Sequence, residues 1–228
     1  MQRIEDVLRR CCGATGARSG FGVTASGVSN ADLDDKSERL AGVLQAHRIG
    51  SGDRVAIFME TGPAAFTAVF AILKAGGIFC PVRAAASAEQ LTFILNDSCA
   101  TCLFVDAGFA PVAAAAMAEA PLLRLIVVCG AEGEPAIDGL IRFEDAIAAE
   151  RKPLASAGTG CDPAMLSYTE RGSAFGEPVA TTHSALLDVA RAGDISGRGP
   201  RRDDLVPQLL AVIAGMRRHR LAAPEVAA

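Results

Sequence analysis

Helical and strand-like patterns alternate along most of the chain. Residues 30–50 carry apolar side chains at helical spacing, with Asn30 available as an N-cap and Gly50 as a stop. Short apolar runs then alternate with further helical segments, in the order strand 53–59, helix 63–77, strand 78–82, helix 87–98, strand 101–106, helix 112–120 and strand 122–130. Alternation of this kind, with short links, is typical of βαβ units. The sequence therefore predicts an α/β fold with a mainly parallel sheet flanked by helices on both sides.

Two local patterns sharpen this prediction. Ser87 stands three residues before Gln90, which is the spacing of a capping box at the start of a helix. Residues 122–130 are almost all apolar, so this strand is expected to be buried on both faces.

The regular pattern weakens after residue 130 and resumes near residue 164. Residues 153–163 are small and polar and read as a linker, where composition alone allows a domain boundary. Strands are then expected at 164–170 and 178–183, and Ser184 is expected to begin a helix.

The domain prediction divides the chain near its C-terminal end. Residues 1–190 are expected to form one partial α/β domain, and residues 191–228 an appended loop and helix that begins near Pro207.

Composition argues against several partners. With 228 residues and a formal charge of only −4, the chain has no strong field that would attract nucleic acid. The basic cluster at residues 217–220 fits the C-terminal end of a helix, where cations complement the helix dipole. The most membrane-like run, residues 64–82, is interrupted by Lys74 and Pro81, and the N-terminus lacks a secretory signal. We therefore expect a cytoplasmic protein that binds neither nucleic acid nor membrane.

The chain contains seven cysteines, so at least one has no intramolecular disulfide partner. Their scatter and the absence of a secretory signal favour reduced thiols. Cys99 and Cys102 form a C-x-x-C motif, so a redox pair or half of a zinc site stays open as an alternative. Cys102, however, begins a predicted strand rather than a helix, and no matching second pair is present. Small buried apolar residues are the favoured interpretation, and no metal site is predicted.

The segment YTERGSAFGEPVATTH, residues 168–183, has the glycines and hydroxyls of a phosphate-binding loop between two strands. Its candidate nucleotide-binding residues are Thr169, Gly172, Ser173 and Gly176. No catalytic residue is assigned, because the lone His183 has no evident carboxylate or nucleophile beside it and is expected to form a hydrogen bond at the strand end.

Several segments in register resemble the adenylate-forming superfamily, which includes acyl-CoA synthetases and the adenylation domains of peptide synthetases. These segments are RLAGVL, RIGSGDRVAIFM, AILKAGG, FCPV and AMLSYT. The resemblance covers roughly residues 5–190 and corresponds to the front half of the large N-terminal domain. It places the loop 168–183 where the family binds ATP, and it retains the family's threonine-histidine pair at Thr182 and His183.

The resemblance implies Mg-ATP as cofactor and a carboxylic acid and coenzyme A, or a carrier thiol, as partners. In the family the acid attacks the α-phosphate of ATP. An ungapped comparison puts Glu177 at the position of the family's loop lysine, and Arg171 and Ala174 at glycine positions. A shifted register puts Val179 there instead. The only lysines are Lys36, Lys74 and Lys152, so the loop has none in either register.

Three functions remain open at this stage. The first is a truncated or degenerate homologue of an AMP-forming acid–CoA ligase that cannot complete acyl-adenylation alone. The second is a non-catalytic interaction module, in which a partner or a second copy covers an exposed sheet edge. The third is a half-enzyme that another chain completes.

Overall fold

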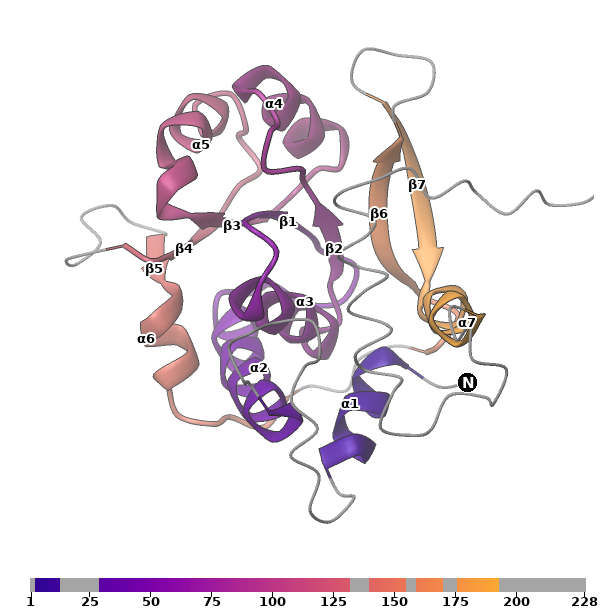
Figure 1. Cartoon of the computed structure of the whole chain (residues 1–228). Coiled ribbons are helices and arrows are strands. Elements are labelled where there is room, and N and C mark those ends of the chain that lie inside the picture. Colours follow the sequence, from indigo (N-terminus) through magenta and orange to yellow (C-terminus); the bar gives the residue numbers. More distant parts are fainter. Residues whose placement is uncertain (1–2, 13–28, 132–139, 155–158, 170–175, 193–228) are drawn as a thin grey trace, which may run out of the picture.

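Seven strands form one sheet in the part of the chain that the computed structural model describes, which comprises residues 3–12, 29–131, 140–154, 159–169 and 176–192. Their order across the sheet is β5-β4-β3-β1-β2-β6-β7 (Figure 1). The strands are β1 (Arg54–Phe58), β2 (Ile78–Pro81), β3 (Cys102–Asp106), β4 (Leu125–Cys129), β5 (Leu140–Arg142), β6 (Pro163–Thr169) and β7 (Glu177–Thr182).

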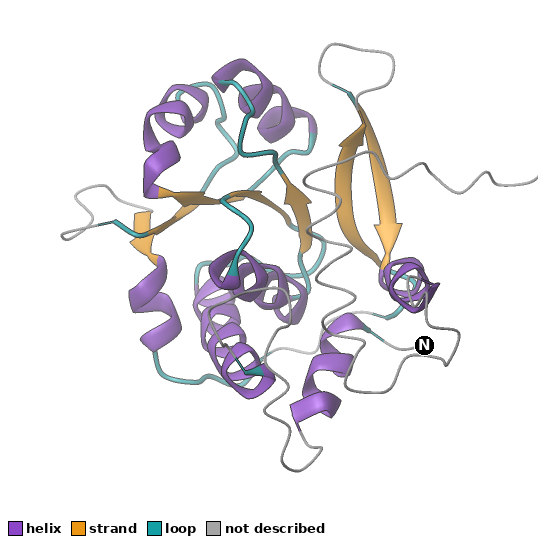
Figure 2. Ribbon diagram, in the orientation of Figure 1, coloured by secondary structure: helices purple, strands orange, loops and turns teal. Residues whose placement is uncertain are grey.

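All neighbouring strands run parallel except β6 and β7, which form an antiparallel hairpin at one edge. A parallel sheet needs crossover connections, and helices supply most of them (Figure 2). The predicted fold class, a mainly parallel sheet flanked by helices, is confirmed.

Seven α-helices and one short 3-10 helix are present in the same described segments. They are α1 (Ile4–Cys12), α2 (Asn30–Ala46), α3 (Pro63–Ala75), α4 (Ala88–Asp97), the 3-10 turn η1 (Ala107–Phe109), α5 (Ala110–Met117), α6 (Phe143–Ala148) and α7 (His183–Ala192).

The helices lie in two layers, one on each face of the sheet (Figure 1). Alternate residues of β1 show the division, because Val55 and Ile57 join the cluster that packs against α2 and α3, whereas Ala56 and Phe58 join the cluster that packs against α4 and α5. Both faces of the sheet are therefore buried, as crossover helices require.

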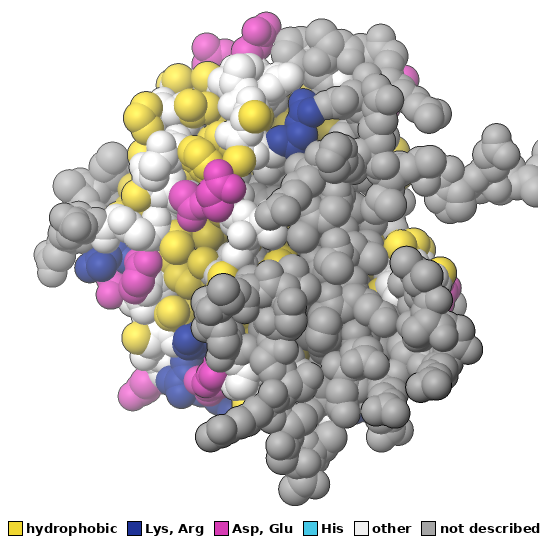
Figure 3. Space-filling model, viewed as in Figure 1, with side chains coloured by type: hydrophobic (Ala, Val, Ile, Leu, Met, Phe, Trp, Pro, Cys, Tyr) yellow, Lys and Arg dark blue, Asp and Glu magenta, His cyan; other side chains and the backbone are white. Residues whose placement is uncertain are grey.

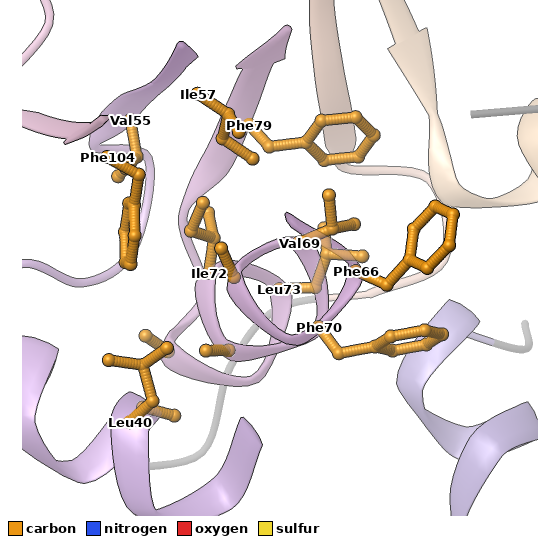
Figure 4. Close-up of a cluster of buried hydrophobic side chains, with 14 of the residues drawn as sticks. Leu40, Val55, Ile57, Phe66, Val69, Phe70, Ile72, Leu73, Phe79 and Phe104 are labelled. Atoms are coloured by element: carbon orange, nitrogen blue, oxygen red, sulfur yellow. The ribbon is translucent and has the colours of Figure 1, made fainter. Parts of the chain in front are cut away.

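Helix α3 is the centre of the larger cluster. Every residue from Ala65 to Ala75 is buried, and Phe66 and Phe70 belong to the same cluster as Phe79 of β2 (Figure 4). Pro63 begins the helix, where its missing N–H costs no hydrogen bond, and Gly76 ends it with φ 90° in the left-handed region. The chain can therefore turn at once into β2.

The residues that begin and end two helices differ from the sequence prediction. Ser29, rather than Asn30, is the N-cap of α2, because its side chain accepts a hydrogen bond from the Asp32 N–H. The Asp32 side chain in turn accepts a hydrogen bond from the Ser29 N–H, which completes a capping box. The same helix ends at Ala46 with His47 as the C-cap, so Gly50 is not its stop.

Helix α7 begins at His183, one residue before the predicted start. Thr182 Oγ1, instead of Ser184, accepts the Ala185 N–H at 3.2 Å and acts as the cap. The Ser87–Gln90 capping box of α4 is confirmed. Burial of β4 on both faces is also confirmed, since Val127 and Val128 are buried in opposite clusters.

Several ion pairs join side chains on the described surface. Figure 3 shows Lys/Arg and Asp/Glu side chains lying next to one another over α2 and α6. Arg39 pairs with Asp35 at 2.8 Å, and Arg151 pairs with Glu38. None of the described helices is both long and apolar enough to cross a membrane. The C-terminal helix expected near Pro207 lies outside the described residues.

Candidate nucleotide-binding site

The candidate loop joins β6 and β7, the antiparallel pair at the edge of the sheet. Thr169 at the end of β6 faces Glu177 at the start of β7, so these two residues form the mouth of the hairpin. Gly176 immediately precedes Glu177; it is buried and has φ 86°, a left-handed conformation that favours glycine. The sheet thus holds both ends of the loop in one place.

The structure brings two of the four predicted nucleotide-binding residues together. Thr169 and Gly176 both lie at the mouth of the hairpin. Gly172 and Ser173 lie outside the described residues, and so does Arg171. Their assignment stays a prediction.

Glu177 gives the mouth of the hairpin a negative charge. Its side chain is exposed, and the described residues of the hairpin, 163–169 and 176–182, include neither lysine nor arginine. In the shifted register Val179 takes the lysine position, and it is 41% exposed and equally unable to attract phosphate. Both registers therefore lack a cation in this part of the hairpin.

Tyr168 anchors β6 to α4 one residue before the mouth. Its hydroxyl donates to Asp97 Oδ2 at 2.7 Å, and its ring meets Phe93 edge-on with centroids 6.0 Å apart. Burial, followed by the hydrogen bond to Asp97, raises the pKa of Tyr168 well above its ordinary value of 10. No pattern in the sequence predicts this contact, because the two residues are 71 positions apart.

His183 lies at the opposite end of β7, where α7 begins. It is buried, and its Nδ1 accepts the Ile4 N–H at 3.4 Å, which agrees with the expected hydrogen-bonding role. A carboxylate partner that sequence reasoning missed is also present, because Glu5 Oε2 lies 3.6 Å from the same nitrogen. Burial lowers the pKa of His183 to about 4, and burial raises the pKa of Glu5 to about 7.

The two cysteines of the C-x-x-C motif are in different environments. Cys102 is fully buried at the start of β3, and burial raises the pKa of its thiol far above the ordinary value. Cys99 is exposed in the turn after α4, and both thiols are free. No group of three or more His, Cys, Asp or Glu side chains suited to a metal ion occurs among the described residues. Neither cysteine lies at the N-terminus of a helix, where the reactive cysteine of a thioredoxin-like redox site lies.

Known structures share this fold. The chain superposes on a putative long-chain-fatty-acid CoA ligase from Rhodopseudomonas palustris CGA009 with a TM-score of 0.72 and 21% identity, covering 83% of this chain and 46% of that one. The anthranilate CoA ligase AuaEII, solved in complex with anthranoyl-AMP, gives a TM-score of 0.70 and 19% identity over 86% of this chain and 36% of the ligase. The chain thus spans less than half of either structure.

Sequence relatives agree with this likeness. The long-chain-fatty-acid–CoA ligase FadD15 of Mycobacterium bovis (strain ATCC BAA-935 / AF2122/97) is 33% identical over 61% of this chain and 24% of its own length. Surfactin synthase subunit 3 of Bacillus subtilis (strain 168) is 27% identical over 73% of this chain and 12% of its own length. A profile of the AMP-binding enzyme family matches residues 20–196, which is most of the chain. The chain therefore belongs to the AMP-binding enzyme family.

Proposed function

We propose that this chain is a homologue of AMP-forming acid–CoA or acid–carrier-thiol ligases whose nucleotide loop has lost strong Mg-ATP binding. It would then not complete acyl-adenylation by itself. The observation that carries the proposal is the exposed Glu177 at the mouth of the β6–β7 hairpin, directly across from Thr169.

The described side chains do not fit the polyphosphate of ATP. Phosphate sites combine backbone N–H groups and hydroxyls with a cation that neutralises the polyanion. Thr169 and Gly176 are residue types that such sites use, but Glu177 beside them supplies a charge of the wrong sign. We therefore derive no reaction step through ATP at this hairpin.

The size of the effect follows from Coulomb's law. A unit charge pair 4 Å apart is worth about 4 kcal/mol at an effective dielectric of 20, before salt screens it. Exchanging an attractive charge for a repulsive one at an exposed mouth is thus expected to weaken nucleotide binding by at least roughly a hundredfold, at about 1.4 kcal/mol per factor of ten.

Calorimetric titration with Mg-ATP tests the proposal. We expect no saturable heat with up to millimolar nucleotide, and no pyrophosphate exchange with a panel of aliphatic and aromatic carboxylic acids. Saturable binding at micromolar Mg-ATP, or acid-dependent exchange, would overturn it. Circular dichroism of the same sample establishes that the protein is folded.

A second candidate function is protein interaction through β7. β7 is the last of the seven described strands, and residues 177–180 are exposed on both of its faces, including Val179. An edge that pairs with no other described strand and carries an apolar side chain suits strand addition by a partner or by a second copy. Light scattering tests this function. A molecular mass that rises with protein concentration in the parent protein and in Leu122→Lys, the control at another exposed apolar side chain, but not in Val179→Lys, would support it.

A half-enzyme completed by another chain predicts a different result. Mg-ATP binding and pyrophosphate exchange, absent from the isolated chain, would then appear on addition of that partner. Failure of every candidate partner to restore both activities would leave the first proposal in place.

A further inference from the structure

The outer strand of the β6–β7 hairpin carries a defined pattern of backbone hydrogen-bonding groups. β7 comes last in the order of the sheet, and no other described strand pairs with its outer side (Figure 1). In an antiparallel pair, alternate residues of a strand bond to the partner strand, and the residues between them direct their N–H and C=O groups away from it. The phase of this alternation decides what β7 offers to a further strand.

A hydrogen bond at the base of the hairpin sets the phase. The His183 N–H donates to the Asp162 carbonyl at 3.3 Å, so the residue that follows β7 is bonded toward β6. Counting back along β7, every second residue is also bonded toward β6, and the residues between them face outward. The first set is Glu177, Val179 and Thr181, and the second set is Pro178, Ala180 and Thr182.

Two prolines agree with this phase. Pro178 lies opposite Tyr168, and Pro163 lies opposite Thr182. Both pairs are ones that the phase leaves without hydrogen bonds between β6 and β7, so neither missing N–H costs a bond in the hairpin. The register shift near Pro163 lies in β6 and does not interrupt the alternation along β7.

The outward side of β7 offers two donors and two acceptors. The donors are the N–H groups of Ala180 and Thr182, and the acceptors are the carbonyls of Pro178 and Ala180. The Thr182 carbonyl is not counted, because Thr182 caps α7, and the carbonyl of an N-cap residue accepts the first backbone hydrogen bond of the helix. Pro178 has no N–H to offer.

We propose that β7 pairs antiparallel with β7 of a second copy of this chain, with the two Ala180 residues opposite each other. This inference rests on protein interaction through β7, the second candidate function, and narrows it to a symmetric dimer. The two Ala180 residues exchange N–H to C=O bonds, and the Thr182 N–H of each copy donates to the Pro178 carbonyl of the other.

The edge is complementary to itself in this register. All four outward groups of each copy form hydrogen bonds, and the N–H that Pro178 lacks comes opposite the Thr182 carbonyl that α7 already uses. A register with the two Val179 residues opposite each other would instead leave the Ala180 carbonyl facing the nitrogen of Pro178, which has no proton. The hydrogen-bond pattern therefore selects the pairing centred on Ala180.

The side chains of β7 suit the same pairing. Val179 comes opposite Thr181 of the other copy, and cross-strand pairs of β-branched residues stabilise sheets. The two Glu177 carboxylates lie at opposite ends of the paired strands, so like charges do not meet. Pairing over six residues is small beside the roughly 1,200–2,000 Å² that stable interfaces bury, so we expect a weak dimer whose population rises with concentration.

Introduced cysteines test the register. Residues 179 and 181 of opposite copies would form a pair without backbone hydrogen bonds, with Cα atoms about 4.5 Å apart, which is within the range of a disulfide. A mixture of Val179→Cys and Thr181→Cys proteins should therefore form the 179–181 disulfide on mild oxidation. The yield should exceed that of either protein alone by at least about tenfold, because two copies of the same residue would be diagonal neighbours about 7–8 Å apart. Peptide mass spectrometry separates this disulfide from any that involves native Cys99 or Cys161.

Removing the outward donor of Ala180 tests the hydrogen bonds. Ala180→Pro deletes this N–H and leaves the bonds between β6 and β7 intact, so the dissociation constant of the dimer in analytical ultracentrifugation should rise about 30-fold. Ala180→Ser keeps the N–H and should dimerise like the parent protein. Circular dichroism checks that each variant is folded, and the disulfide test does not depend on Ala180→Pro.

Three results would overturn the proposal. They are a parent protein that stays monomeric at all concentrations, a folded Ala180→Pro that dimerises like the parent, and a Val179→Cys protein that links to itself as readily as the mixture links. Association that depends on Val179 but gives no 179–181 disulfide would also overturn the symmetric pairing. That last result would leave protein interaction through β7 supported, so the two ideas fail separately.

Discussion

Lys74 Nζ of α3 lies 2.6 Å from Asp34 Oδ1 of α2 and also donates to the Asp34 backbone carbonyl at 2.7 Å. The Lys74 side chain is completely buried, and burial lowers its pKa despite the neighbouring carboxylate. One of the three lysines of the chain thus joins two helices of the core instead of contacting phosphate.

Removing one partner of this pair should destabilise the protein. Asp34→Ala leaves the Lys74 ammonium buried without a counter-ion, and we expect a loss of about 3–5 kcal/mol in the free energy of unfolding. Adding Lys74→Met to that variant should recover much of the loss. Asp35→Ala removes only the exposed pair with Arg39 and should cost less than about 1 kcal/mol. Urea unfolding followed by circular dichroism measures all three, and equal losses for Asp34→Ala and Asp35→Ala would contradict the assignment.

The layered fold was predictable because its signals are local. The apolar spacing in α2, the buried runs of β1 and β4 and the Ser87–Gln90 capping box each depend on residues close together in sequence. At the start of α2, Ser29 and Asn30 are both residue types that cap helices, and the capping box with Asp32 places the cap at Ser29. At its end, the helix stops at Ala46 with His47 as the C-cap, before the chain reaches Gly50.

The contacts that shape the candidate site were not predictable in the same way. Tyr168 with Asp97 and His183 with Glu5 join residues far apart in sequence, and a single sequence carries no sign of such pairs. The unusual charge at Glu177 was visible, because it depends on one residue type at one position of a familiar pattern.

The single tyrosine allows a direct test of the Tyr168–Asp97 contact. Because burial and the hydrogen bond both raise the pKa of Tyr168, its absorbance near 295 nm should change at a higher pH than that of free tyrosine. Asp97→Asn should lower this pKa but leave it above 10, since burial remains. A titration that matches free tyrosine while circular dichroism still reports a folded protein would contradict the contact.

Thiol reactivity should separate Cys99 from Cys102. The exposed Cys99 is expected to be alkylated by iodoacetamide at pH 8, whereas Cys102 should react only when the protein unfolds, because it is fully buried and its pKa is raised. Peptide mass spectrometry after timed alkylation measures both rates. Equal labelling of the two residues in the folded protein, or a Cys99–Cys102 disulfide after mild oxidation, would restore the redox interpretation.

Restoring the positive charge at the hairpin mouth tests the cause of weak nucleotide binding. Glu177→Lys should tighten Mg-ATP binding by at least roughly a hundredfold relative to the parent protein. Glu177→Gln should lie between the two, because it removes the repulsion without adding an attraction. Glu119→Lys makes the same charge change at an exposed position near the end of α5 and should have no comparable effect. Raising the salt concentration should reduce the gain in Glu177→Lys, as expected for an exposed charge. If all four proteins bind Mg-ATP equally in calorimetry, the charge at residue 177 does not control binding, and the cause must lie elsewhere in the loop.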